Sequence, residues 1–242
     1  MEPACAAVGE VCCAQVLADI MSRLLHALFI TQYSMSLSSR LWQQHSALVQ
    51  ASLKHPFVQG IGDGTLPREK FAYYVGQDAF FLEAFARAYS VAAGKAPTWE
   101  GFKVFHGLAA GVLQELTLHQ SYAETWGVEL QTVVPGKATR QYTDFLLASA
   151  WSHPVEVVAA AMAPCMRLYA YLGQQLAQPA VPDHSYSDWI ETYSSDEFEP
   201  LALQLEGILD TYGDDSEAVG AAYGYAMVCE RDFFEAAWQY AG

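Results

Sequence analysis

The sequence predicts an all-α protein, and three observations support this fold class. Apolar residues recur at spacings of three and four from Leu41 onward, the period of a helical face. No run of strand length alternates apolar and polar residues between turn signals. Hydrophobic residues make up 52% of the chain and charged residues only 16%, which indicates long buried helices, or subunits that bury further surface in an oligomer.

The charge and the cysteines narrow the class of protein. A formal net charge of −15 argues against nucleic acid or an anionic membrane as a partner, because both select basic surfaces. Three of the five cysteines lie near the N-terminus and the other two are far apart, so the chain has no disulfide framework. This usage is typical of a reducing compartment and favours a cytoplasmic location.

Residues 1–40 differ in pattern from the rest of the chain and are interpreted as an N-terminal extension, before a single helical domain over residues 41–242. Glu2 and Glu10 precede the first basic residue, Arg23, which argues against a signal peptide. Charged residues interrupt the apolar run, so no uncharged span there could cross a bilayer. Two alternatives stay open. The extension is disordered or absent from a native protein that starts at Met35, or it is an amphipathic arm that packs on a neighbour.

The domain begins with a predicted helix over Leu41–His55, which Pro56 ends. The cluster Gly60–Gly64 is interpreted as a turn. It is no phosphate loop, because it matches neither GxGxxG after a strand nor a loop ending in GK[ST].

A long helix is predicted from Pro67 to about Ala93, with Asp78 centred on its apolar stripe. An unpaired buried carboxylate costs several kcal/mol, so Asp78 needs hydrogen bonds, a partner or a ligand. A tyrosine–aspartate hydrogen bond is the structural alternative. The apolar residues of the stripe are Phe71, Tyr74, Val75, Phe81, Leu82, Phe85 and Tyr89.

The next predicted helix, over Trp99–Trp126, carries Glu115 and His119 one turn apart. Such a pair can be half of a metal site. The remaining histidines of the domain form no second pair of this spacing, so a hydrogen bond that bridges two helices is the favoured interpretation.

Pro135-Gly136 precedes a fourth helix that ends at His153-Pro154, and Tyr142 lies on its apolar face with Phe145, Leu146 and Ser149. The helix around Ala159–Gly173 places Cys165 on a stripe with Val158, Met162, Tyr169 and Leu172. Pro164 removes one helix N–H and leaves a carbonyl free beside the sulfur. A lone cysteine on such a stripe is most often a small inert hydrophobe, and on this stretch alone that alternative stands.

The C-terminal part completes the pattern. Ser187–Tyr193 is predicted as a short helix, and Ser194–Glu197 as the cap and acidic first turn of another. After a turn at Gly213–Ser216, the last helix covers about Ala218–Tyr240 and places Glu230 at the centre of its stripe. The apolar members of that stripe are Tyr223, Met227, Phe234 and Ala237.

Three helices thus each carry one reactive group at the middle of an apolar face: Asp78, Cys165 and Glu230. Neighbouring helices of a bundle meet at such positions, so we expect a pocket with a nucleophile and two acid/base groups. Tyrosines on the same kinds of face would give it aromatic walls, which favour a flat, uncharged ring. Carboxylates can bind ring nitrogens or an amino group and transfer protons.

Five stretches resemble the thiaminase II (TenA) family, in the order and spacing of that family. They are HPFVQGIGDGTLPREKFAYYVGQD, ELTLHQSYAETWGV, APCMRLYAYLG, WIETYSSDEF and CERDFFEAAW, and the resemblance runs from about Leu41 to the C-terminus. It implies a haem-oxygenase-like helical bundle that acts without a cofactor or metal, as a homotetramer. It also implies hydrolysis of aminopyrimidine products of thiamin breakdown, such as aminomethylpyrimidine to hydroxymethylpyrimidine, and activity on thiamin itself.

The resemblance implies a role for each candidate residue. Cys165 matches the nucleophile that adds to a pyrimidine ring carbon, Glu230 the carboxylate that contacts the ring and passes protons, and Asp78 the aspartate on the ring's nitrogen side. Cys165 places the chain in the cysteine-containing class, and Glu115 and His119 become a scaffold pair. The matched pocket residues are Tyr142, Tyr169, Tyr193 and, where many members have tyrosine, Phe81.

Two departures and two alternatives accompany this resemblance. Phe81 lacks a hydroxyl that would contact the leaving group, and Phe234 follows Phe233 where tryptophan is frequent, so both bear on substrate preference rather than reaction class. A non-catalytic pyrimidine-binding or regulatory protein is one alternative, against which the acidic charge argues. A metal-dependent oxidase on the same fold is the other.

Overall fold

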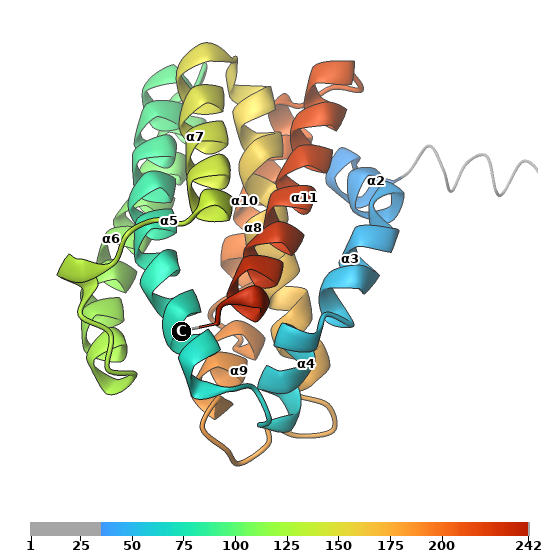
Figure 1. Ribbon diagram of the computed structural model, residues 1–242. Coiled ribbons are helices and arrows are strands. Elements are labelled where there is room, and N and C mark those ends of the chain that lie inside the picture. The colour runs from blue at the N-terminus through green and yellow to red at the C-terminus, as the bar shows by residue number, and fades with distance from the viewer. Residues whose placement is uncertain (1–34, 242) are drawn as a thin grey trace, which may run out of the picture.

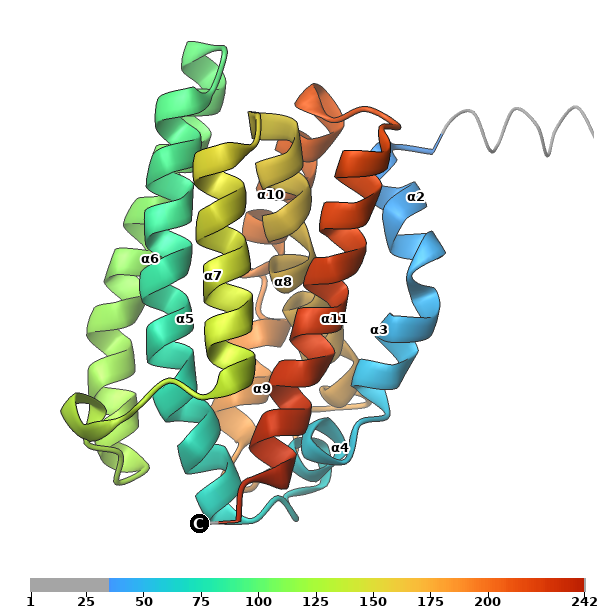
Figure 2. The same cartoon turned by 45° about the horizontal axis from the view of Figure 1, so that its top comes forward.

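The structure, a computed structural model, describes residues 35–241, and every regular element in that range is helical. The predicted all-α class is therefore confirmed. The long helices run side by side and form an elongated bundle (Figures 1 and 2). Most of the predicted N-terminal extension, residues 1–34, lies outside the described residues.

Helix α8 (Val155–Leu176) forms the centre of the bundle and packs against α5, α7, α9, α10 and α11. Every member of its predicted stripe, Cys165 included, is buried. By length and hydropathy α8 would pass as a membrane span, yet 83% of its most apolar window is buried inside the protein. The apolar character of α8 is thus accounted for by its place in the core.

Helices α5 (Arg68–Lys95) and α6 (Trp99–Thr125) form an antiparallel pair along one side of the bundle (Figure 2). The side chain of Thr98 begins α6 by accepting a hydrogen bond of 3.1 Å from the Gly101 N–H. After the short 3₁₀ helix η1 (Leu130–Thr132), α7 (Lys137–Ser152) returns to pack on α5 and α8. All the apolar residues predicted for the stripe of α5 are buried, and so is Asp78.

Helix α11 (Glu217–Gln239) packs on α8 and α7 and buries its whole predicted stripe, including Glu230. Ser216 caps α11 by accepting from the Val219 N–H. Helices α9 (Ser187–Ser194) and α10 (Glu199–Tyr212) cover α8 from other sides. Because these helices turn their apolar faces toward the core, the side chains of Asp78, Cys165 and Glu230 on those faces point inward.

The single helix predicted over Leu41–His55 is wrong, because the chain forms α2 (Leu37–Gln44) and α3 (Ser46–Leu53). The break is at His45, whose φ of −99° and ψ of 16° leave the helical range. The two pieces pack mainly on different neighbours, α2 on α10 and α3 on α11. The Ser38 N–H donates to Asp210 Oδ1 at 2.7 Å and ties α2 to α10.

The turn predicted at Gly60–Gly64 is also wrong, since most of it belongs to α4 (Pro56–Asp63). Only Gly64 leaves the helix, with a φ of 77° that favours glycine. Gly60 instead allows close packing, because a Cβ there would lie 3.0 Å from the Leu66 Cβ. The helix start predicted at Ser194–Glu197 is likewise too early, since the chain near Ser195 forms a turn before α10 begins at Glu199.

Gly173 of α8 lies directly against the backbone of α9, and it yields a test of their packing. A Cβ added there would overlap the Tyr193 backbone and lie 2.7 Å from the Ser194 nitrogen. We expect Gly173→Ala to lower the free energy of unfolding by about 1–3 kcal/mol, because the helices must separate. Urea titration followed by circular dichroism measures the change.

The matched control is Gly107→Ala in α6, where an added Cβ meets nothing within 4 Å. That variant should gain up to about 1 kcal/mol, because alanine has the higher helix propensity. Equal stability of the two variants would contradict the close approach of α8 and α9.

Candidate functional site

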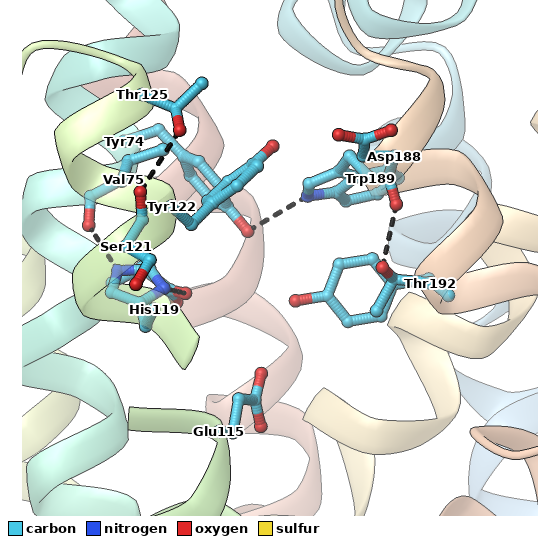
Figure 3. A pocket seen from close by; sticks show the side chains of 12 residues that line it. Tyr74, Val75, Glu115, His119, Ser121, Tyr122, Thr125, Asp188, Trp189 and Thr192 are labelled. Carbon is cyan, nitrogen blue, oxygen red and sulfur yellow. Dashed lines mark hydrogen bonds and ion pairs between the residues drawn. The ribbon is translucent and has the colours of Figure 1, made fainter. Parts of the chain in front are cut away.

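A cavity of about 400 Å³ lies between α5, α6 and α9 (Figure 3). Its exposed rim consists of Ser121, Thr125, Asp188 and Thr192, whereas its inner residues, such as Asp78 and Trp189, are buried. This size suits a small molecule. The other lining residues are Tyr74, Val75, Glu115, His119, Tyr122 and Tyr193.

Asp78 reaches the inner end of the cavity from the middle of α5 and is held beside His119 of α6. The Nδ1 of His119 lies 3.9 Å from Asp78 Oδ2. Its Nε2 lies 2.9 Å from the Val75 carbonyl oxygen, which only accepts, so Nε2 carries a hydrogen and Nδ1 faces the carboxyl. Burial raises the pKa of Asp78 above its ordinary value, and His119 opposes that rise.

Cys165, Glu230 and Tyr142 form a second buried group, contributed by α8, α11 and α7. Tyr142 donates a hydrogen bond of 2.6 Å to Glu230 Oε1, and the Cys165 thiol is a hydrogen-bonding neighbour of the same carboxyl. Burial raises the pKa of Glu230 to about 7, although the bonds from Tyr142 and Cys165 favour its charged form.

The same burial raises the pKa of the Cys165 thiol well above its usual range, and the nearby carboxylates of Glu230 and Asp78 add to the rise. The thiol is therefore neutral at rest. Since the charge of Asp78 acts on both Cys165 and Glu230, the structure brings the three predicted groups into one region. Cys165 and Glu230 lie beside the cavity, not in its lining.

Aromatic side chains connect the cavity with this second group. Tyr74 donates a hydrogen bond of 3.1 Å to the Tyr169 hydroxyl and accepts one of 3.3 Å from Trp189 Nε1. The ring of Tyr193 lies 4.8 Å from Tyr169 and 4.7 Å from Trp189. Of the two predicted tyrosines, Tyr193 lines the cavity and Tyr169 packs against it from outside the lining. Tyr74 and Trp189, which were not predicted for the site, also line the cavity.

The two remaining predicted residues lie together behind Asp78. Phe81, one turn along α5, places its ring 4.9 Å from that of Tyr142 and also packs on Phe85 and Phe233. Neither Phe81 nor Tyr142 lines the cavity. Phe81 therefore provides an apolar support for Tyr142, whose hydroxyl is engaged with Glu230.

Glu115 and His119 do share one face of α6, but the metal interpretation finds little support. His119 uses Nε2 for the Val75 carbonyl, and within residues 35–241 no group of three or more His, Cys, Asp or Glu side chains could hold an ion. Glu115 instead lines the cavity as a separate acid. Burial and the charge of Asp78 raise its pKa to about 7.

Comparisons with known proteins agree with this architecture. The chain is 35% identical to the "Thiamine biosynthesis multifunctional protein ThiED" of Corynebacterium efficiens, over 81% of this chain and 28% of that protein. It is also 35% identical to the "Aminopyrimidine aminohydrolase" of Halalkalibacterium halodurans, over 73% of this chain and 81% of that protein. The chain thus spans about a quarter of the multifunctional relative and most of the second.

Solved structures show the same fold. A TenA homologue from P. horikoshii OT3 has a TM-score of 0.79 at 25% identity, covering 85% of this chain and 99% of that one. Haem oxygenase-1 of Synechocystis has a TM-score of 0.56 at 16% identity, covering 84% of this chain and 92% of that one, which confirms the haem-oxygenase-like bundle. The model of the TENA/THI-4/PQQC family matches residues 42–237, and the chain belongs to this family.

Proposed function

We propose that this protein hydrolyses aminopyrimidine products of thiamin breakdown, converting aminomethylpyrimidine to hydroxymethylpyrimidine in thiamin salvage. The observation that carries the proposal is the buried contact of Cys165 with Glu230, next to a cavity that ends at Asp78. Relatives named aminopyrimidine aminohydrolase, at 34–36% identity, support the reaction class. Thiamin carries the same bond from a pyrimidine methylene to nitrogen, so it is a second candidate substrate.

The site has the groups that bind a flat ring. The rings of Tyr193 and Trp189 offer aromatic surface at the cavity wall, and Tyr169 packs against both. Ring nitrogens need donors. Burial raises the pKa of Glu230 to about 7, so part of this carboxyl is protonated near neutral pH, and burial also raises the pKa of Asp78 above its ordinary value. We place the ring between these two acids, with one ring carbon over the Cys165 sulfur.

The first chemical step requires a base, because the Cys165 thiol is neutral at rest. Glu230 is in position, and its pKa of about 7 suits proton transfer at neutral pH. The sulfur bonds to the ring carbon while Glu230 takes the thiol proton. The displaced electron pair moves to a ring nitrogen, which takes a proton from a carboxylic acid.

The adduct then releases the amine. Electrons return from the ring nitrogen toward the exocyclic carbon, and the ring nitrogen gives its proton back to the carboxylate that supplied it. The bond between the exocyclic carbon and the protonated amine breaks, and the amine leaves as ammonia. Water adds to the resulting exocyclic methylene as hydroxide, and its remaining proton passes to the ammonia. The ring carbon expels the sulfur, which regains its proton from Glu230. In the net reaction, the aminomethyl group reacts with water to give a hydroxymethyl group and ammonia, and the reaction needs no oxidant or reductant.

We propose in addition that the protein is a cytoplasmic homotetramer. Large apolar side chains support an assembly: Trp151 is 72% exposed and Leu113 is 59% exposed, on the outer face where α5, α6 and α7 meet. Sedimentation velocity should give the mass of four chains, and a single species with the mass of one chain would contradict the assembly.

The nucleophile assignment has a direct test. Cys165→Ser should lower the release of ammonia from aminomethylpyrimidine by at least about a thousandfold, because serine cannot replace the thiol in this apolar setting. Circular dichroism should be unchanged. Cys229→Ser, at the other buried cysteine, is the control and should keep its activity. Equal turnover by the two variants would remove Cys165 from the mechanism.

The pKa of Glu230 predicts a pH dependence of stability. Its folded-state value of about 7 exceeds the ordinary 4.5, so the stabilisation is full below pH 4.5 and is lost as pH rises through 7. The loss corresponds to about 3 kcal/mol. Glu230→Gln, which stays neutral, should match the wild type near pH 4.5 and lose less stability by pH 8. Parallel curves from urea unfolding would show that Glu230 titrates normally.

A further inference from the structure

The side of the cavity formed by α6 and α9 is acidic and lacks a cation. Glu115 and Asp188 line it, with Asp78 at its inner end, and no lysine or arginine is among its lining residues. In Figure 3 the Glu115 carboxylate faces the space between α6 and α9. Among residues 35–241, no hydrogen bond or ion pair joins Glu115 to another side chain.

A second polar group at this place has no protein partner. The Tyr122 hydroxyl comes from the same face of α6 and lines the cavity. Trp126 lies near it, but no hydrogen bond of ordinary geometry satisfies this buried hydroxyl among the described residues. Buried polar atoms are nearly always paired, and the half-buried Glu115 carboxylate faces the same cavity, so the two groups together offer a place for a ligand. His119 also lines the cavity, but its Nε2–H donates to the Val75 carbonyl oxygen. A carboxylate beside a hydroxyl, with no lysine or arginine in the lining, suits a cation that donates hydrogen bonds.

Glu115 is also placed to reach a group attached to the ring. Burial is the main cause of the raised pKa of the Tyr193 hydroxyl and of the Cys165 thiol, and the charge of Glu115 adds a smaller part to both, so the carboxylate lies within electrostatic reach of both. A substituent that leaves a ring held over Cys165 and points along the cavity therefore approaches Glu115. The proposed substrate carries an aminomethyl arm, which is protonated at neutral pH as a lysine side chain is.

We propose that Glu115 is a specificity residue that binds the protonated amine of the substrate, with Asp188 at the entrance favouring its approach. This inference rests on the proposed function and adds the class of substrate: pyrimidines with a cationic arm are preferred to neutral ones, and phosphorylated pyrimidines are excluded. Glu115 holds the amine beside the carbon from which it leaves. Its role is in binding, separate from the proton transfers of Glu230.

The pKa of Glu115, raised to about 7, agrees with this role. Desolvation is the main cause, and the negative charge of Asp78 adds to it. A bound ammonium would offset both effects and favour the ionised carboxylate. A neutral ligand would leave Glu115 without a counter-charge, so the site should bind cationic pyrimidines more tightly than neutral ones.

The test is Glu115→Gln, which keeps the shape of the side chain and removes its charge. KM and kcat are measured for aminomethylpyrimidine and for its N-formyl derivative, whose arm is neutral, and Kd for hydroxymethylpyrimidine. We expect KM for the amine to rise about tenfold or more, as the loss of one close ion pair predicts. KM for the formyl compound and Kd for the alcohol should change less than about twofold.

Glu124→Gln is the matched control, because it removes the same charge from an exposed position of α6 outside this cavity. It should leave all three constants unchanged. An equal change for the amine and the formyl compound, or a loss confined to kcat, would overturn the assignment of Glu115 to amine binding. If the wild type binds none of the three compounds, the proposed function itself fails, and this inference fails with it.

Discussion

The hydrogen bond from Tyr142 to Glu230, inside the apolar core, is the interaction on which the site depends. An isolated carboxylate in such a place costs several kcal/mol, and in the described residues no lysine or arginine pairs with Glu230, Asp78 or Glu115. Tyr142 and the Cys165 thiol offset only part of the desolvation, so the pKa of Glu230 stays near 7. The bundle therefore holds a proton acceptor suited to neutral pH directly beside a neutral thiol.

Burying these side chains together constrains how the helices that carry them are rotated, in addition to their packing on α8. Asp78, Cys165 and Glu230 come from α5, α8 and α11. Cys165 and Glu230 are hydrogen-bonding neighbours and the charge of Asp78 acts on both, so these three helix faces point toward one region of the bundle. The bond of Tyr74 to Tyr169 and that of Trp189 to Tyr74 connect α5, α8 and α9 at the cavity wall. Family membership and the resemblance to TenA structures agree with the helical bundle that carries these residues.

Much of the fold could be predicted because a helical stripe depends on residue spacing alone. The stripes around Asp78, Cys165 and Glu230 are all buried as expected. Glycine was misleading at Gly60, which serves close packing inside α4 and makes no turn. The position of Glu115 within the cavity, and the partnership of Trp189 with Tyr74, could not be predicted. Both depend on how α6 and α9 are rotated and placed against α5, which periodicity does not encode.

The central claim is that one pyrimidine ring touches Asp78, Glu230 and the Cys165 sulfur at the same time. A crystal structure of the protein with bound hydroxymethylpyrimidine measures this most directly. The account predicts ring nitrogens within hydrogen-bond distance of both carboxyls, and one ring carbon in van der Waals contact with the sulfur. A ring bound only at the rim, near Thr125 and Thr192, with the sulfur out of contact, would contradict it.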